Sequence, residues 1–148
     1  MSKDVYESPL ASRYASPYLL RLFSPDTRYQ TWRRLWVALA RAEHELGLPI
    51  TAEQVAELEA HITDIDYEAA ERREREVRHD VMAHVYAYGL AAPSAAGIIH
   101  LGATSCYVTD NADLILCRDA LRYLRGQLLA VMKNLSAFAR QYAATPTL

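Results

Sequence analysis

The sequence predicts an all-α protein, and three observations lead to this prediction. Only five of the 148 residues are glycine, which disfavours a loop-rich or all-β chain. Serine and threonine residues stand where they can cap helices, directly before stretches with helical periodicity. The last third of the chain carries an unbroken heptad repeat of apolar residues. With 51% hydrophobic and 23% charged residues, the chain is expected to be globular rather than disordered.

The charge balance disfavours two classes of partner. Sixteen Lys and Arg residues against 18 Asp and Glu residues give a net charge of −2. General nucleic-acid and membrane-surface binders need a basic excess, so we expect neither nucleic acid nor membrane as a partner. The longest nearly apolar stretch, 89–103, is also too short to cross a bilayer.

Nothing in the sequence suggests export. The N-terminus lacks the apolar segment of a secretory signal. The two cysteines, Cys106 and Cys117, would share a helix face about 16 Å apart, which is too far for a disulfide. These features predict a cytoplasmic protein.

Two Ser-Pro pairs mark helix starts near the N-terminus, since proline is tolerated at the first helical position. They are Ser16-Pro17 and Ser24-Pro25, and the second opens a helix over about 26–46. Gly47 is expected to end this helix. Its apolar stripe should face the core and comprises Tyr29, Trp32, Leu35, Trp36, Leu39, Ala42 and Leu46. The residues expected to face away are Arg33, Arg34, Arg41 and Glu45.

Three shorter elements are expected next. Thr51 and Gln54 form a capping box for a helix to about residue 61. A helix from Asp66 carries the charge run EAAERREREVR, which is typical of a solvated face. A break near 78–80 would let Asp80 cap a helix over 81–88, ended by Gly89. The segment 93–105 predicts a short helix and a tight loop, with Ser94 as a cap.

The strongest helical signal lies at 110–142. Such a helix would extend about 50 Å, whereas a compact domain of this length has a diameter of about 40 Å. It should therefore protrude and need partner helices from more chain or more subunits. We divide the chain into a helical domain over 1–109 and a long helix over 110–148, and the missing terminal element makes a truncated sequence the expectation. The heptad residues are Leu114, Cys117, Leu121, Leu124, Leu128, Val131, Leu135, Phe138 and Tyr142.

Three segments carry candidate chemistry, although each has an ordinary structural interpretation. His79 and Asp80 place a base beside a carboxylate. Arg13-Tyr14 would suit a phosphate. The small residues of 102–105 would let an anionic carboxylate approach backbone N–H groups before the long helix.

The histidines do not form a recognisable zinc motif. HDVMAH is superficially similar to HExxH, but His79 and His84 are five residues apart, or about 140° around a helix, and cannot share a metal. His100 is expected to be a structural histidine in an apolar loop, and His44 and His61 to lie on the surface.

Four strings occur in order along the chain: SPLASRYASP, WRRLWVALARAEHELGLPI, RHDVMAHVYAYG and AAGIIHLGATSCYVTDNAD. Together they resemble the N-terminal region of the adenylosuccinate lyase family, in the fumarase and aspartase superfamily. The resemblance covers essentially the whole chain, and RHDVMAH and GATSCYV are its most discriminating pieces. It implies the N-terminal helical domain of that superfamily plus the start of its long-helix bundle.

The resemblance also implies an assembly and a reaction. The family forms a homotetramer around a bundle of long helices, which would supply partners for 110–142. Its reaction is a β-elimination in purine biosynthesis: adenylosuccinate yields AMP and fumarate, and succinylaminoimidazole-carboxamide ribotide yields fumarate too. No metal or organic cofactor takes part. A base and an acid move protons on a heavily anionic substrate, which needs local positive charge.

The same resemblance implies the roles of individual residues. Arg13 and Tyr14 would contact the phosphate end of the nucleotide. Thr104 and Ser105 would hold a carboxylate of the succinyl part. The segment Arg78, His79 and Asp80 would line the site, with His79 binding and orienting the substrate; acid catalysis by His79 is the alternative.

The chain departs from the family pattern in two places. It ends at Pro146-Thr147-Leu148, just before the THxQ motif of the catalytic histidine, and the SSAMPYKxNP loop with the serine base is absent. Each family site combines segments of three subunits, and this chain holds the first. We therefore expect a fragment, about the first third of the enzyme, without lyase activity of its own.

Two other interpretations stay open. A helical metal phosphohydrolase could use His61, His79-Asp80 and Asp110 or Asp113 as metal ligands. A non-catalytic helical module could instead join a tetramer of full-length subunits.

Overall fold

Helices make up most of residues 6–146, which are the residues that the computed structural model describes. No strand occurs in this part of the chain, so the all-α prediction is confirmed. Residues 1–5 and 147–148, at the ends of the two predicted regions 1–109 and 110–148, lie outside the described residues. The elements are η1 (Leu10–Tyr14), α1 (Pro17–Leu22), α2 (Pro25–Glu45), α3 (Ala52–Ala60), α4 (Tyr67–Val77), α5 (Asp80–Ala91), η2 (Pro93–Ala95) and α6 (Ser105–Gln141).

The predicted boundaries of α1 and α2 are confirmed. The hydroxyl of Ser16 accepts from the Leu19 amide and that of Ser24 from the Thr27 amide, both at 3.3 Å. At the end of α2, Gly47 has φ +84°, the left-handed conformation that glycine adopts without strain. The Leu48 amide then reaches back to the Glu43 carbonyl at 3.0 Å, which closes the helix.

Capping also explains where α3 and α4 begin. The Gln54 amide donates to the Thr51 hydroxyl at 3.2 Å, and the Thr51 amide donates to the Gln54 side chain at 3.0 Å. This is the predicted capping box. The Asp66 carboxylate accepts from the Ala69 amide at 2.9 Å, so α4 begins at the predicted place.

The core lies where α2, α3, α5 and the start of α6 meet. Trp32 and Trp36 of α2 are 1% and 0% exposed, and their rings meet edge to face with centroids 6.2 Å apart. The buried Tyr88 hydroxyl of α5 donates to the Leu58 carbonyl of α3. Other core residues are Val37, Ile50, Val55, Val81, Ile99, Val108 and Ala112.

The predicted faces of α2 are wrong at three positions, because Arg33 is buried and both Ala42 and Leu46 are exposed. Arg33, expected to face away, is only 1% exposed. Its guanidinium lies 4.2 Å from the Tyr88 ring centroid, and Nη1 donates to the carbonyls of His61 and Asp64, while Nη2 is buried without a hydrogen-bond partner. Leu46, expected in the apolar stripe, is 80% exposed because it lies at the end of the helix, past the packed part.

The predicted limits of α5 also need correction. Asp80 is the first residue of the helix rather than its cap, and its carboxylate accepts from the adjacent Val81 amide at 2.7 Å. The helix continues through Gly89 to Ala91. A side chain at Gly89 would begin 3.0 Å from the Ala96 Cβ, so this glycine permits close packing instead of ending the helix.

Ser94 does not cap the segment that follows. It lies inside η2, and its hydroxyl donates to the Glu57 carboxylate of α3. The side-chain amide of Gln54 also donates to the Ser94 carbonyl, at 2.7 Å. Ser94 therefore joins this segment to α3.

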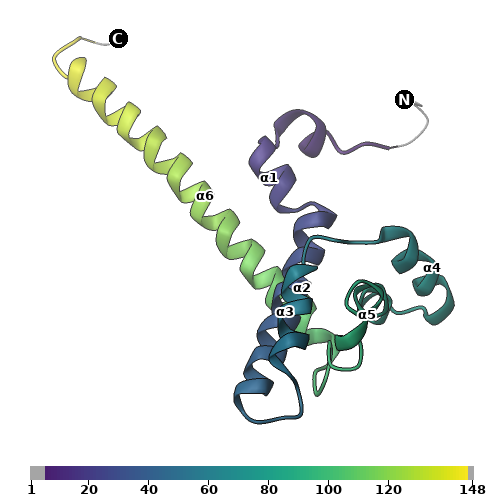
Figure 1. The fold of residues 1–148 in the computed structure, drawn as a ribbon. Helices are drawn as coiled ribbons and strands as arrows, with labels where there is room; N and C mark the ends of the chain where they lie inside the picture. Colours follow the sequence, from purple (N-terminus) through teal and green to yellow (C-terminus); the bar gives the residue numbers. More distant parts are fainter. Residues whose placement is uncertain (1–5, 147–148) are drawn as a thin grey trace.

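Helix α6 projects from the body, as predicted (Figure 1). It begins at Ser105, five residues before the expected start, because Thr104 already has extended N-cap geometry. Its 37 residues span about 55 Å. The boundary drawn between 109 and 110 therefore lies within one continuous helix. Among residues 6–146, no helix is both long and apolar enough to cross a membrane.

One face of α6 packs against the body, and the other is exposed. The packed face contacts the body through Val108, Ala112, Leu116 and Ala120, spaced four residues apart. The heptad stripe lies on other positions and is exposed, with Leu121 at 66% and Leu135 at 63%. The body therefore leaves the predicted stripe uncovered.

Stability should fall in mild acid because of His84. This side chain is 5% exposed and stacks on Tyr29 with centroids 3.7 Å apart. Burial, helped by the charge of Arg33, lowers its pKa to about 4, against 6.5 in the unfolded chain. The unfolded state thus takes up the proton first, so this contribution is complete above pH 6.5 and is lost as the pH falls toward 4. We expect a loss of about 2 kcal/mol.

Urea unfolding at pH 7 and pH 4.5 measures this loss. In a His84→Phe variant, which keeps the ring stack, the difference between the two pH values should shrink by that amount. His44→Phe, at an exposed position, is the control and should leave it unchanged. An equal pH dependence in both variants would contradict the prediction.

Candidate functional site

The turn between α4 and α5 holds three of the candidate residues. Arg78 ends α4 with φ 52° and ψ 42°, and its amide donates to the Glu74 carbonyl at 2.7 Å. His79 is extended, and Asp80 opens α5. All three side chains are exposed. The tight turn thus presents a guanidinium, an imidazole and a carboxylate side by side.

The left-handed backbone of Arg78 is a strained position for any residue other than glycine. An L-residue pays about 1 to 2 kcal/mol in this conformation. Glycine is the usual residue at the end of a helix for this reason. An arginine kept here points to a use of its side chain outside folding.

Arg78→Gly should therefore stabilise the chain, by about 1 kcal/mol. The matched control is Arg75→Gly, in the last helical turn of α4, which should destabilise it by a similar amount. Urea unfolding of both variants gives the comparison. Destabilisation by both substitutions would show that the Arg78 conformation carries no strain.

His79 lies next to a charged side chain. Its Nδ1 lies 3.6 Å from the Asp80 Oδ1, an ion-pair distance when the ring is protonated. Burial, with a smaller contribution from the charge of His79, lowers the pKa of His100 in the loop before α6.

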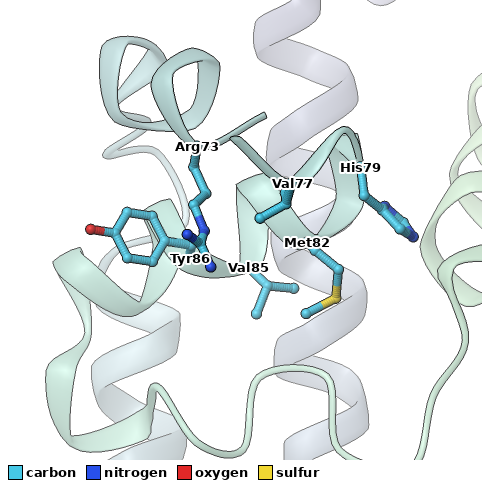
Figure 2. A pocket seen from close by; sticks show the side chains of 6 residues that line it. All are labelled: Arg73, Val77, His79, Met82, Val85 and Tyr86. Atoms are coloured by element: carbon cyan, nitrogen blue, oxygen red, sulfur yellow. The ribbon is translucent and has the colours of Figure 1, made fainter. Parts of the chain in front are cut away.

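Figure 2 shows the surface pocket beside this turn. Val77, Met82 and Val85 line it with apolar groups. The Arg73 guanidinium lies 5.2 Å from the Tyr86 ring centroid at one end, and His79 lies at the other end, turned away from this pair. Arg73 and His79 thus lie at opposite ends of a hollow whose middle is apolar.

His100 is the structural histidine that the sequence predicts. Trp36 Nε1 donates to its Nδ1 at 3.0 Å, which requires that nitrogen to be unprotonated. The bond ties the loop 98–104 to α2. The pairing of Trp36 with His100, which are 64 residues apart, could not be identified from the local sequence pattern.

The loop before α6 has the geometry expected of an anion site. Gly102 has φ +65°, and Thr104 makes no capping bond with its own side chain. The first amides of a helix lack intrahelical acceptors and attract anions. The Glu43 carboxylate lies 3.8 Å from where a side chain on Gly102 would begin. Burial raises the pKa of Glu43.

Arg13 and Tyr14 lie on η1, apart from the other candidates. Tyr14 is 73% exposed, and the Arg13 guanidinium carbon lies 6.0 Å from its ring centroid. In the part of the chain that the structure describes, no carboxylate pairs with Arg13, and no hydrogen bond or ion pair joins η1 to Arg78, His79 or Thr104. The structure brings Arg78, His79 and Asp80 together in one turn and shows, among the described residues, no polar contact that joins this turn to η1.

The ligand set of the alternative metal site is dispersed. Within residues 6–146, no three His, Cys, Asp or Glu side chains are placed to hold one ion. His61 Nδ1 pairs with Asp64 Oδ2 at 2.7 Å, and the Asp110 carboxylate accepts from the Thr109 hydroxyl at 2.9 Å. His61 and Asp110 are thus engaged with their own sequence neighbours.

Sequence comparisons place the chain among known proteins, although no protein-family model matches it. It is 53% identical over 146 residues to the adenylosuccinate lyase of Schizosaccharomyces pombe, covering 97% of this chain and 30% of that protein. It is 51% identical over 148 residues to the adenylosuccinate lyase of Saccharomyces cerevisiae, covering 98% and 31%. For that of Methanothermobacter thermautotrophicus the identity is 32% over 134 residues, covering 88% and 30%. The chain spans about 30% of the length of these curated relatives.

Proposed function

Since the chain is homologous over almost its whole length to the adenylosuccinate lyases, we propose that it forms a substrate-binding part of such a lyase. The proposed reaction is the β-elimination that releases fumarate from adenylosuccinate, leaving AMP, and from succinylaminoimidazole-carboxamide ribotide. The single observation that carries the proposal is 53% identity across 97% of the chain.

The charges of the candidate residues suit this substrate, which has a phosphate and two carboxylates. The chain as a whole has a net charge of −2, so its positive groups must act locally. Arg13, with Tyr14, is proposed to hold the phosphate end. The exposed Arg78 supplies a second cation, and its strained backbone is consistent with a role in binding.

The remaining candidates are proposed to orient the substrate. His79 can donate from its ring, and the Asp80 carboxylate lies 3.6 Å from its Nδ1. Thr104 and Ser105 would hold a succinyl carboxylate at the N-terminus of α6, where helix amides attract anions. Each group would be preorganised by a backbone element rather than by a loose loop.

Proton transfer is proposed to depend on residues outside this chain, which spans about 30% of its relatives. We further propose a homotetramer, for which the exposed apolar stripe of α6 offers a surface. The two cysteines are free, as is typical of cytoplasmic proteins, and we propose that location.

A chimera tests the proposed function. The matching segment of the S. cerevisiae adenylosuccinate lyase is replaced by this chain, and adenylosuccinate cleavage is followed by absorbance beside the 148-residue chain alone. We expect an active chimera and an inactive chain. The second substrate is assayed in parallel.

Three outcomes would count against parts of this proposal. A chimera that assembles but cleaves neither substrate would overturn the function. Activity of the chain alone would overturn the assignment of proton transfer to other residues and bring His79 and His84 back as candidates. A chimera with His79→Ala that keeps full activity would remove His79 from the site.

The exposed stripe also supports a second candidate, a non-catalytic module that joins full-length subunits. In that case the chain would enter a tetramer of intact lyase and lower its activity. To test this second function, the purified chain is mixed with the S. cerevisiae enzyme, and the mass and the activity of the mixture are measured. A substrate-binding part of a lyase would instead give an active chimera.

A further inference from the structure

The segment that carries Arg13 and Tyr14 is weakly anchored. Neither η1 nor α1 contains a buried residue. The end of α1 is held by the Thr27 hydroxyl, which donates to the Arg21 carbonyl at 2.7 Å. Among residues 6–146, no side-chain hydrogen bond joins the beginning of α1 to α2, so the direction of η1 depends on other contacts.

One such contact is an aromatic stack with the projecting helix. The ring of Tyr18, in the first turn of α1, lies 4.4 Å from the ring of Tyr123 on α6, with an angle of 21° between the planes. Figure 1 shows α1 beside the part of α6 that leaves the body, with η1 beyond α1. Tyr18 is four residues from Tyr14 along the chain.

Tyr123 differs from its neighbours on α6. Of residues 121–146, it alone is not exposed. It follows Ala120 by three positions and so extends the face that packs on the body, while the heptad stripe runs through Leu121 and Leu124. Tyr123 is therefore the last residue of the α6 face that packs within the chain, and its ring stacks on α1.

We propose that Tyr123 is a positioning residue that holds α1, and through it Arg13 and Tyr14, in the orientation that binds the anionic end of the substrate. This inference rests on the proposed function for its ligand. A ligand binds less tightly when the competent orientation is only partly populated, in proportion to that population. Loss of the stack should thus weaken binding without changing the chemical step.

Kinetics of the chimera test the positioning role. Tyr123→Ala is expected to raise KM about fivefold with kcat within twofold, and Tyr18→Ala to do the same. The double variant should be no worse than either single one, since both remove one contact. Tyr123→Phe keeps the stack and should restore KM. Lys133→Ala, at an exposed position of α6 off the heptad stripe, is the control and should leave KM unchanged.

Hydrogen exchange on the 148-residue chain tests the anchoring separately from activity. Tyr123→Ala should speed exchange of the Leu20 and Phe23 amides of α1 about tenfold, with the amides of α3 unchanged. Unchanged exchange in α1, or an unchanged KM in a chimera where Arg13→Ala raises it, would overturn the proposal. If exchange speeds up but Arg13→Ala has no effect on KM, the assignment of Arg13 to the substrate fails, while the anchoring by Tyr123 stands.

Discussion

A Trp36→Ala variant is expected to unfold with about 4 kcal/mol less free energy than the unchanged chain. Trp36 is fully buried at the centre of the core, in contact with Trp32, Tyr88 and His100. Truncating a buried tryptophan loses its transfer free energy and leaves a cavity, which together cost about 3 to 5 kcal/mol. The variant also removes the donor that satisfies His100 Nδ1.

Circular dichroism during urea unfolding measures this loss without relying on tryptophan emission. Trp36→Phe separates the two contributions, because it keeps most of the ring but cannot donate to His100. We expect it to cost about 1 to 2 kcal/mol. If Trp36→Ala cost no more than Trp36→Phe, packing would not be the main contribution of this residue.

An Arg33→Ala variant should lose about 3 kcal/mol. The guanidinium Nη1 donates to the His61 carbonyl and, at 2.9 Å, to the Asp64 carbonyl, and its plane meets the Tyr88 ring. Hydrogen bonds from a charged donor contribute about 1.5 to 3 kcal/mol each. Part of this is offset by the cost of burying the charge, which lowers the pKa of Arg33. The net loss also includes the space left in the core.

The neighbouring arginine is the control. Arg34 is exposed, and Arg34→Ala should change the free energy of unfolding by less than about 0.5 kcal/mol. The same urea titration compares both variants. Equal midpoints for the two would mean that the buried contacts of Arg33 contribute nothing net.

Local signals predicted the helices well, because caps and turns are short-range. Ser24, Thr51 and Asp66 each bond an amide three residues ahead, and Gly47 adopts the left-handed conformation expected of it. Such interactions need only neighbouring residues. The limits of α5 were predicted less well, since Gly89 is set by its contact with Ala96 and Pro93 follows the true end.

Long-range partners explain the errors. The spacing of Tyr29, Trp36 and Ala40 places Arg33 at the edge of the apolar stripe, and its charge suggested a solvated position. Only the carbonyls 28 and 31 residues away make its burial favourable. A single sequence does not reveal that such acceptors converge on one side chain.

The candidate site was likewise predictable where it depends on adjacent residues and not where it depends on long-range packing. Adjacent residues such as Arg78, His79 and Asp80 could be named from the sequence, and the turn presents them together. The strain at Arg78 could not, because its left-handed backbone depends on how α4 and α5 meet. Tyr123 was overlooked because it lies off the heptad stripe.

The projection of α6 has a mechanical consequence. The helix leaves the body near Ala120, and residues 121–141 continue for about 30 Å. A rod of this length acts as a lever: a tilt of about 10° at its root moves the tip by about 5 Å, on the same length estimate. A partner bound at the tip of α6 therefore exerts a larger torque on the root than one bound close to the body. Tyr123 lies at this root. If Tyr123 positions Arg13 as proposed above, a partner that fixes the far end of α6 would also restrict the motion of Arg13.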